Sequence, residues 1–267
     1  MENKSALRIL MDNLKKILPF LILSLPIYAQ EAKPGIIKIS DLQSAYVDRP
    51  GDLYILQKNG TLKKFDIGNN IVNDIPFPSI PIAFDPRDGA RMFVCFKSTC
   101  SYFSAETRQE FDIEPQYAID PQLMCSSGDH NFWILDRSDV SIKRIDPKQS
   151  KVIADTPIDQ KQFTMTPEFT FMREYQNFLF IIEKNSGILI FNSLGKQIKK
   201  IPITQVEHLG FLGEELYYKK KDKLYFYDLF DASTREMPID ARCRYAFLTD
   251  TRKYLVYENR IEIFEIH

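Results

Sequence analysis

A pair of short strands joined by a tight turn recurs six times along this sequence of 267 residues. The clearest copy is GDLYILQKNGTLKKFDIGN, residues 51–69, in which two partly apolar runs flank the dipeptide Asn59-Gly60. Asn-Gly adopts the positive φ angles of a tight hairpin turn at little cost, so the stretch predicts a β-hairpin. Counted from Asp52, the equivalent positions are Arg91, Asn131, Asn177, Glu215 and Lys253, at spacings of 39, 40, 46, 38 and 38 residues.

Six hairpins at this spacing are typical of a β-propeller with four strands in each blade. An apolar strand precedes each hairpin, as in SAYVDRPG, and an outer strand that ends near proline follows most of them, as in IVNDIPFP. The last hairpin ends near His267 without an outer strand, so we expect GIIKIS, residues 35–40, to close the last blade. The predicted fold is all-β: a six-bladed β-propeller of four-stranded antiparallel blades, in a single domain of residues 30–267.

Two segments carry a resemblance to known propellers. AYVDRPGDLYILQKNGTLKKFD (residues 45–66) and NFWILDRSDVSIKRID (residues 131–146) resemble the repeats of six-bladed NHL and TolB-like propellers. Those repeats have an Asp-x-x-Gly-Asp/Asn-aliphatic-Tyr core followed by an apolar-x-x-Phe-Asp strand. The resemblance is clear in the first and third blades and looser in the second and fifth. It includes no catalytic motif, so it implies the fold and not the function.

The N-terminal stretch MDNLKKILPFLILSLPIYAQEA predicts a bacterial secretory signal peptide over residues 1–29. Lys15 and Lys16 form its basic region, and the apolar stretch of residues 17–27 is too short to span a bilayer comfortably. Ala29, with Ile27 two residues earlier, suits cleavage before Gln30. The alternative is an uncleaved anchor. Cleavage would leave a periplasmic or secreted protein without a transmembrane segment.

Composition makes some classes of function improbable. Residues 1–29 contain four basic and two acidic side chains, so the remaining chain has 31 basic and 34 acidic residues and a net charge of −3. Nothing in this balance suggests nucleic-acid binding. The four cysteines and three histidines lack metal-ligand spacing, so we expect no metal site and no cofactor.

The cysteines themselves predict one disulfide. Cys95 and Cys100 lie on facing strands of one predicted hairpin, where an oxidising compartment would favour a cross-strand bond. The alternative is that both are small buried apolar residues. Cys125 and Cys243 are expected in the inner strands of the third and sixth blades, on opposite sides of the channel and too far apart to bridge.

Acids and bases gather in the turns that follow the inner strands. The candidate residues at this channel mouth are Asp48, Asp85, Arg87, Asp129, His130 and Arg173. One interpretation is a small-molecule hydrolase that uses the central channel, lactonase-like or phosphotriesterase-like, as some six-bladed propellers are. The other is that Asp48, Asp85 and Asp129 cap tight turns through backbone amides. The sequence has no Ser-His-Asp signature, glycine-rich phosphate loop or HExxH motif.

Basic residues occupy the turns at the opposite end of five blades. These residues are Lys58, Lys97, Arg137, Lys184 and Lys219. The long connection between the third and fourth blades reaches the same end and contains Phe163 and Met165. Solvated turn lysines would explain the pattern without a function. Its repetition favours an exported, non-enzymatic scaffold for a protein partner or an anionic ligand in the cell envelope, such as an accessory subunit of an outer-membrane complex.

Overall fold

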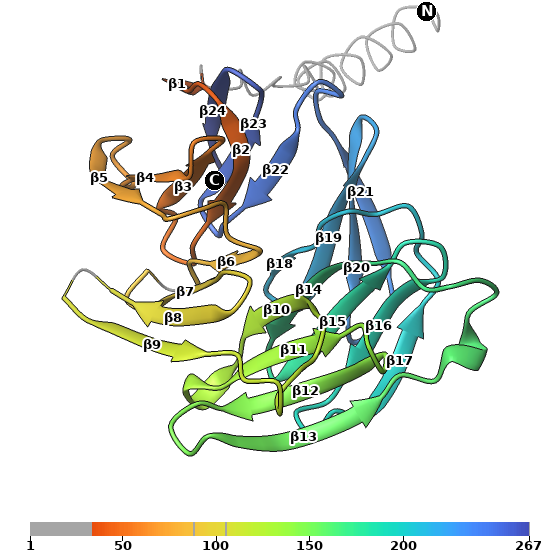
Figure 1. Ribbon diagram of the computed structural model, residues 1–267. Coiled ribbons are helices and arrows are strands. Elements are labelled where there is room, and N and C mark those ends of the chain that lie inside the picture. The colour runs from red at the N-terminus through yellow and green to blue at the C-terminus, as the bar shows by residue number, and fades with distance from the viewer. Residues whose placement is uncertain (1–33, 88, 105, 267) are drawn as a thin grey trace, which may run out of the picture. The chain divides into compact units, whose positions relative to one another are not determined.

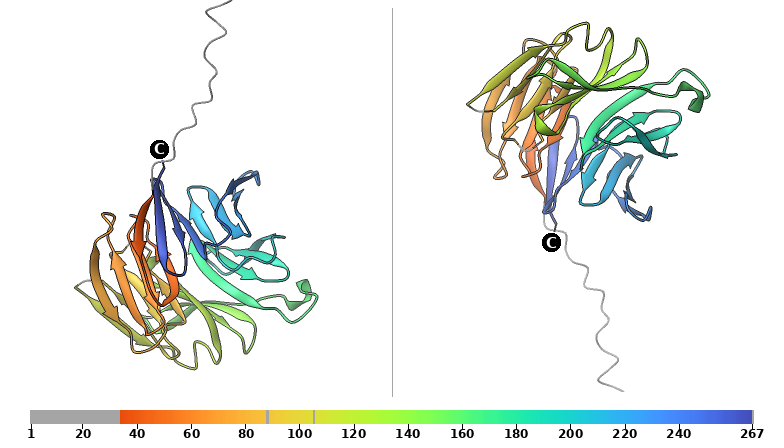
Figure 2. Two further views of the ribbon diagram at one scale, coloured as in Figure 1. Left: turned by 90° about the horizontal axis from the view of Figure 1, so that it is seen from above. Right: turned by 90° about the horizontal axis from the view of Figure 1, so that it is seen from below.

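The short apolar runs form β-strands throughout the computed structural model, which describes residues 34–87, 89–104 and 106–266. Within these ranges 24 strands make six four-stranded antiparallel sheets, and no α-helix is present. The sheets are arranged around a common centre, with the first and last side by side (Figures 1 and 2). The six-bladed β-propeller predicted from the spacing is therefore confirmed. None of the described residues forms a helix with the length and apolar character needed to cross a membrane.

The strands of each blade follow one another from the channel outward. The first blade contains β2 (Leu42–Val47), β3 (Leu53–Gln57), β4 (Thr61–Phe65) and β5 (Ile71–Pro76). The second contains β6 (Ala83–Asp85), β7 (Met92–Cys95), β8 (Thr99–Phe103) and β9 (Arg108–Asp112). The third contains β10 (Pro121–Ser126), β11 (Phe132–Asp136), β12 (Ser141–Asp146) and β13 (Lys151–Pro157).

The second half repeats this order. The fourth blade contains β14 (Phe169–Tyr175), β15 (Phe178–Glu183), β16 (Gly187–Phe191) and β17 (Gln197–Ile201). The fifth contains β18 (Gly210–Leu212), β19 (Glu215–Lys220), β20 (Lys223–Asp228) and β21 (Thr234–Pro238). The sixth contains β22 (Tyr245–Leu248), β23 (Arg252–Val256), β24 (Arg260–Glu265) and β1 (Gly35–Lys38).

The last blade is completed by the N-terminal strand, as predicted. β1 pairs antiparallel with β24 in a register that places Gly35 opposite Ile263 and Ile37 opposite Ile261. The strand ends at Lys38, two residues earlier than the predicted segment. This pairing gives β24 a partner on both sides, so it does not remain an open sheet edge.

Six apolar clusters hold the blades together, one between each pair of neighbours. The cluster between the sixth and first blades joins Ile37 and Phe247 to Ile55, which closes the ring through side chains as well as through β1. Between the fifth and sixth blades, Tyr217 lies flat on Gly210, where a Cβ would meet the ring at 2.0 Å. The Tyr217 hydroxyl accepts a hydrogen bond from the Leu248 amide at 2.8 Å, so this glycine allows one residue to link two blades.

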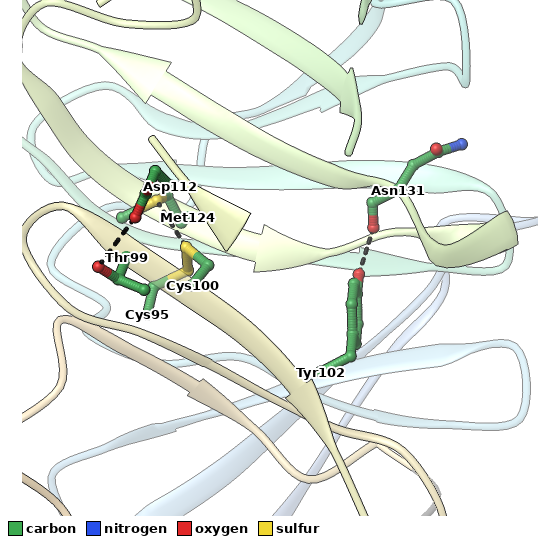
Figure 3. Close-up of a disulfide and its surroundings, with 7 residues drawn as sticks. All are labelled: Cys95, Thr99, Cys100, Tyr102, Asp112, Met124 and Asn131. Atoms are coloured by element: carbon green, nitrogen blue, oxygen red, sulfur yellow. Dashed lines mark hydrogen bonds between the residues drawn. A yellow bond between two sulfur atoms is a disulfide. The ribbon is translucent and has the colours of Figure 1, made fainter. Parts of the chain in front are cut away.

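The second blade contains the disulfide predicted from the sequence (Figure 3). Cys95 and Cys100 are directly opposite in the β7–β8 pair, with Cα atoms 4.1 Å apart. Cys125 and Cys243 are buried free thiols. Cys243 lies in the turn before β22 and not in the inner strand, because Arg244 and Tyr245 begin the pairing with Val256.

Candidate binding channel

The innermost strands surround a central cavity of about 700 Å³. Each blade contributes residues to the cavity wall. In blade order, one example from each is Tyr46, Asp85, Cys125, Arg173, His208 and Tyr245. We call the end with the turns between first and second strands, and between third and fourth strands, the inner-turn end. The other end, with the turns between second and third strands and the links between blades, is the connection end.

Asp48, at the inner-turn end, caps its own turn. Its Oδ1 accepts hydrogen bonds from the amides of Gly51 at 3.0 Å and Asp52 at 2.8 Å, and its Oδ2 accepts one from the Tyr54 hydroxyl at 2.9 Å. Its side chain is buried, and this burial raises the pKa of Asp48. Two of these bonds close the turn, and the third joins the turn to β3 of the same blade. The capping interpretation therefore describes this residue.

Asp85 and Arg87 join the second blade to the third. Asp85 Oδ1 accepts a bond from the Arg87 amide at 3.0 Å, and Oδ2 accepts one from the Ser126 hydroxyl. The Arg87 guanidinium donates to the same hydroxyl at 3.0 Å. Asp85 thus caps a turn, as the second interpretation expected, and also contacts the neighbouring blade.

Glu174 is the centre of this polar cluster, although only its neighbour Arg173 was among the candidate residues. It lies in β14, is buried, and accepts hydrogen bonds from the Trp133 indole at 2.8 Å and from the Gly128 amide at 2.9 Å. The Ser127 hydroxyl also donates to it, and the Arg87 guanidinium lies 3.7 Å away. Three blades therefore share one buried carboxylate, which we call the Glu174 network.

The remaining inner-turn candidates lie beside this network. Burial, together with the charges of Glu174 and Asp85, raises the pKa of the Cys125 thiol, so this cysteine stays protonated at neutral pH. Asp129 and His130 belong to a short 3₁₀ turn, Gly128–His130, and the side chain of Asp129 lies outside what the structure describes. The His130 ring faces Tyr102, with centroids 6.2 Å apart.

Arg173 lies on the cavity wall. Its guanidinium is 5.9 Å from the centre of the Phe211 ring, and no described carboxylate pairs with it within 4.0 Å. His208, also on the wall, contacts Phe171 at 4.7 Å and Phe247 at 5.7 Å between ring centroids. Burial among these rings and the charge of Arg173 lower the pKa of His208 to about 3, so its imidazole is neutral.

The basic turns at the connection end differ in their partners. Three of them form ion pairs, measured from the side-chain nitrogen to a carboxylate oxygen. Lys58 pairs with Glu258 at 3.6 Å, Arg137 with Asp120 at 2.7 Å and Lys184 with Glu168 at 2.8 Å. Lys97 is exposed. Lys219 faces the cavity together with Lys220 and Lys221, and none of the three has a carboxylate within 4.0 Å among the described residues. The basic ring is therefore uneven, with its unneutralised charge concentrated on the fifth blade.

The loop beside the third and fourth blades presents one apolar side chain to solvent. Met165 is 59% exposed. Phe163 packs inward against Phe169, with ring centroids 5.9 Å apart, and the Lys200 ammonium lies over the Phe163 ring, 5.4 Å from its centre. Of the two residues predicted to contact a partner, Met165 has the larger exposed surface.

No grouping of three or more His, Cys, Asp or Glu side chains that could hold a metal ion occurs in the described part of the chain. The carboxylates of Asp48, Asp85 and Glu174 are occupied by amides, hydroxyls and the indole described above. No arrangement among these residues favours the hydrolase alternative.

Comparisons with known proteins show the fold alone. No protein-family model matches the chain, and no curated protein does. Virginiamycin B lyase from Staphylococcus aureus is similar in structure, at 11% identity over 88% of this chain and 100% of that one, with a TM-score of 0.54. BBS1N in its complex with ARL6DN is similar at 9% identity over 89% and 97%, with a TM-score of 0.58.

A third similar structure covers only part of a larger protein. PorZ, a bacterial surface component of the type-IX secretion system of Porphyromonas gingivalis, is 11% identical over 83% of this chain and 30% of that one, with a TM-score of 0.53. An enzyme, a protein in a complex and a secretion component thus share this architecture, which agrees with the rule that fold does not determine function.

Proposed function

We propose that this chain is an exported β-propeller that acts without catalysis, as a scaffold for an acidic protein partner in the cell envelope. The proposal includes the cleavage of residues 1–29, which lie outside the described residues, and a place in an outer-membrane complex. Two similar structures agree with it: BBS1N is bound to another protein, and PorZ is a surface component of a secretion system.

The observation that carries the proposal is the unneutralised charge at the connection end. Lys219, Lys220 and Lys221 lie together at the tip of the β19–β20 hairpin and face the channel opening. Clustered charges of one sign raise the local potential, steer an oppositely charged partner and make its binding sensitive to salt. The exposed Met165, at the same end, offers an apolar contact of the kind found in interface cores.

The test is co-purification from detergent-solubilised envelopes of the native host at increasing salt. We expect a specific partner to be retained by the wild-type protein, to be released as salt rises, and to be lost from the variant Lys219→Glu/Lys220→Glu/Lys221→Glu. Intact mass of the native protein tests export, because cleavage before Gln30 removes residues 1–29.

A matched control carries three charge reversals at the inner-turn end: Arg49→Glu/Lys148→Glu/Lys196→Glu. These three side chains are exposed, and none has an acidic partner within 4.0 Å among the described residues. We expect this control to retain the partner. Loss of the partner from the control but not from the lysine variant would place the interface at the wrong end and refute the proposal.

A further inference from the structure

The cavity in the channel has properties that the proposed scaffold role does not use. Its volume of about 700 Å³ falls within the range of small-molecule sites, roughly 300–1,000 Å³. All six blades form its wall, so its shape is fixed by the ring as a whole and not by a mobile loop. A rigid preformed cavity binds a ligand without an additional cost for ordering the protein.

The charge on the cavity wall is unbalanced. Five cationic side chains line it, Arg173, Lys219, Lys220, Lys221 and Arg244, against two carboxylates, Asp85 and Glu207. Of the five cations, only Arg244 has an acidic partner within 4.0 Å among the described residues, the Glu258 carboxylate at 3.6 Å. Asp85 is already occupied by the Ser126 hydroxyl and the Arg87 amide. Low-dielectric walls focus the field of an unbalanced charge, so an anion gains more here than on an open surface.

Arg173 is the arginine of this set that has no acidic partner within 4.0 Å among the described residues. The next residue of β14, Glu174, does not neutralise it, because that carboxylate is used by Trp133, Ser127 and Gly128 in the Glu174 network. Guanidinium groups bind carboxylates through two parallel hydrogen bonds, a geometry that a lysine does not reproduce.

Flat rings also line the cavity, and one of them, His208, is close enough to Arg173 for that charge to lower its pKa. Phe171 contacts His208, and His208 in turn lies 6.4 Å from Tyr245 between ring centroids. Tyr46 packs against Phe84 at 5.0 Å, and all of these residues line the cavity. Since His208 is neutral, it adds a flat surface and hydrogen-bonding nitrogens without adding a further positive charge.

We propose that the channel is a binding site for a small aromatic carboxylate, with the carboxylate on Arg173 and the aromatic body among Phe171, His208 and Tyr245. The carboxylate supplies the missing counter-charge, and the ring stacks on walls that offer edge and face contacts. The proposed protein interface uses other contacts, the lysines at the opening and Met165, although those lysines also line the cavity.

The experiment measures binding of 2-naphthoate to the purified mature chain by calorimetry, with 2-naphthamide as its neutral analogue and inorganic phosphate as a test of charge alone. We expect naphthoate to bind at least about tenfold more tightly than the other two, because a hydrogen bond to a charged group contributes roughly 1.5–3 kcal/mol. Equal binding of acid and amide, phosphate binding as tight as naphthoate, or no naphthoate binding at millimolar concentration would each overturn the proposal.

Variants locate the site. Arg173→Met should weaken naphthoate binding about tenfold or more, and Arg173→Lys should give an intermediate loss, because a point charge remains without the paired geometry. The matched control is Arg49→Met, an exposed arginine that does not line the cavity. Unchanged naphthoate binding in Arg173→Met, with a melting temperature like that of wild type, would show that the ligand sits elsewhere. Retention of the protein partner by Arg173→Met would separate this site from the scaffold role.

Discussion

The two ends of the channel use charged residues in opposite ways. At the inner-turn end, Asp48, Asp85 and Glu174 are buried or partly buried, and their oxygens are occupied by amides, hydroxyls and an indole. At the connection end, the lysines of the fifth blade are unneutralised and face the opening. A buried polar group must be hydrogen-bonded to be tolerated, whereas an exposed lysine contributes little to folding. The first end therefore stabilises the ring, and the second is available for binding.

The substitution Glu174→Ala should have the largest effect on stability, and it tests the difference between the two ends most directly. It leaves the Trp133 indole, the Gly128 amide and the Arg87 guanidinium without their shared acceptor. We expect the free energy of unfolding to fall by about 3 kcal/mol, because unpaired buried donors and a broken buried ion pair are both costly. Urea denaturation followed by tryptophan fluorescence measures it. Glu258→Ala, at the connection end, should cost less than about 0.5 kcal/mol, and equal losses in the two variants would remove the distinction between the ends.

Asp48→Ala should have the next largest effect. It removes the acceptor for two backbone amides and the Tyr54 hydroxyl. We therefore expect the free energy of unfolding to fall by about 2 kcal/mol. Asp48→Asn retains one amide-accepting oxygen, so it should lose about half as much. Thermal and urea unfolding measure both variants. A loss in Asp48→Asn as large as that in Asp48→Ala would mean that the charge matters more than the turn geometry.

The lowered pKa of His208 predicts that the stability of the fold depends on pH. Its pKa is about 3 in the folded chain and about 6.5 in an unfolded one. Below about pH 6.5 the unfolded chain therefore binds a proton that the folded chain does not, and stability falls as pH falls. We expect the free energy of unfolding to fall by about 1 kcal/mol from roughly pH 7 to pH 5. This is less than a fully buried ring would give, because the His208 ring also faces the channel.

The measurement is the difference in unfolding free energy between these two pH values, for wild type and His208→Gln. The variant should lack most of the dependence, since glutamine does not titrate. Stability that rises as pH falls, or an unchanged slope in the variant, would contradict the low pKa of this imidazole.

A small effect on stability is expected from the variant Lys219→Glu/Lys220→Glu/Lys221→Glu. These side chains have no acidic partners to lose among the described residues, so the unfolding free energy should change by less than about 1 kcal/mol. Thermal unfolding of this variant and of the inner-turn control measures the change. A loss as large as that of Glu174→Ala would show that the lysines serve the fold.

Local sequence chemistry was sufficient for the architecture. Asn59-Gly60 specified a hairpin, and the regular spacing of its copies specified the number of blades. The absence of an outer strand after the last hairpin assigned that place to the N-terminal strand, which β1 occupies. The Cys95–Cys100 pair followed from the hairpin register. The hairpin and the disulfide need only residues that are neighbours in one hairpin, and the other two inferences need only the repetition of that hairpin along the chain.

The candidate site was less accessible to prediction because its contacts join different blades. Trp133 and Glu174 are 41 residues apart, and the alternation of apolar residues does not report how two blades are rotated relative to each other. Two further contacts lie within or beside one blade: Lys184 pairs with Glu168 next to the neighbouring strand, and Phe163 turns inward onto Phe169. The sequence pattern did not indicate these partners either. The available signal for Glu174 was its place beside Arg173, among the acids and bases at the ends of the inner strands.

The closure of the last blade has a consequence for the order of assembly. Ile37 and Ile261, which face each other in that sheet, are 224 residues apart, so this pairing forms only after nearly the whole chain is present. Long-range strand pairing is slow, and an unpaired edge accepts any matching strand. At high concentration the matching strand comes from a second copy, and exchange of β1 would link two rings into a dimer. Refolding at low concentration should therefore favour the single ring, and refolding at high concentration the exchanged pair.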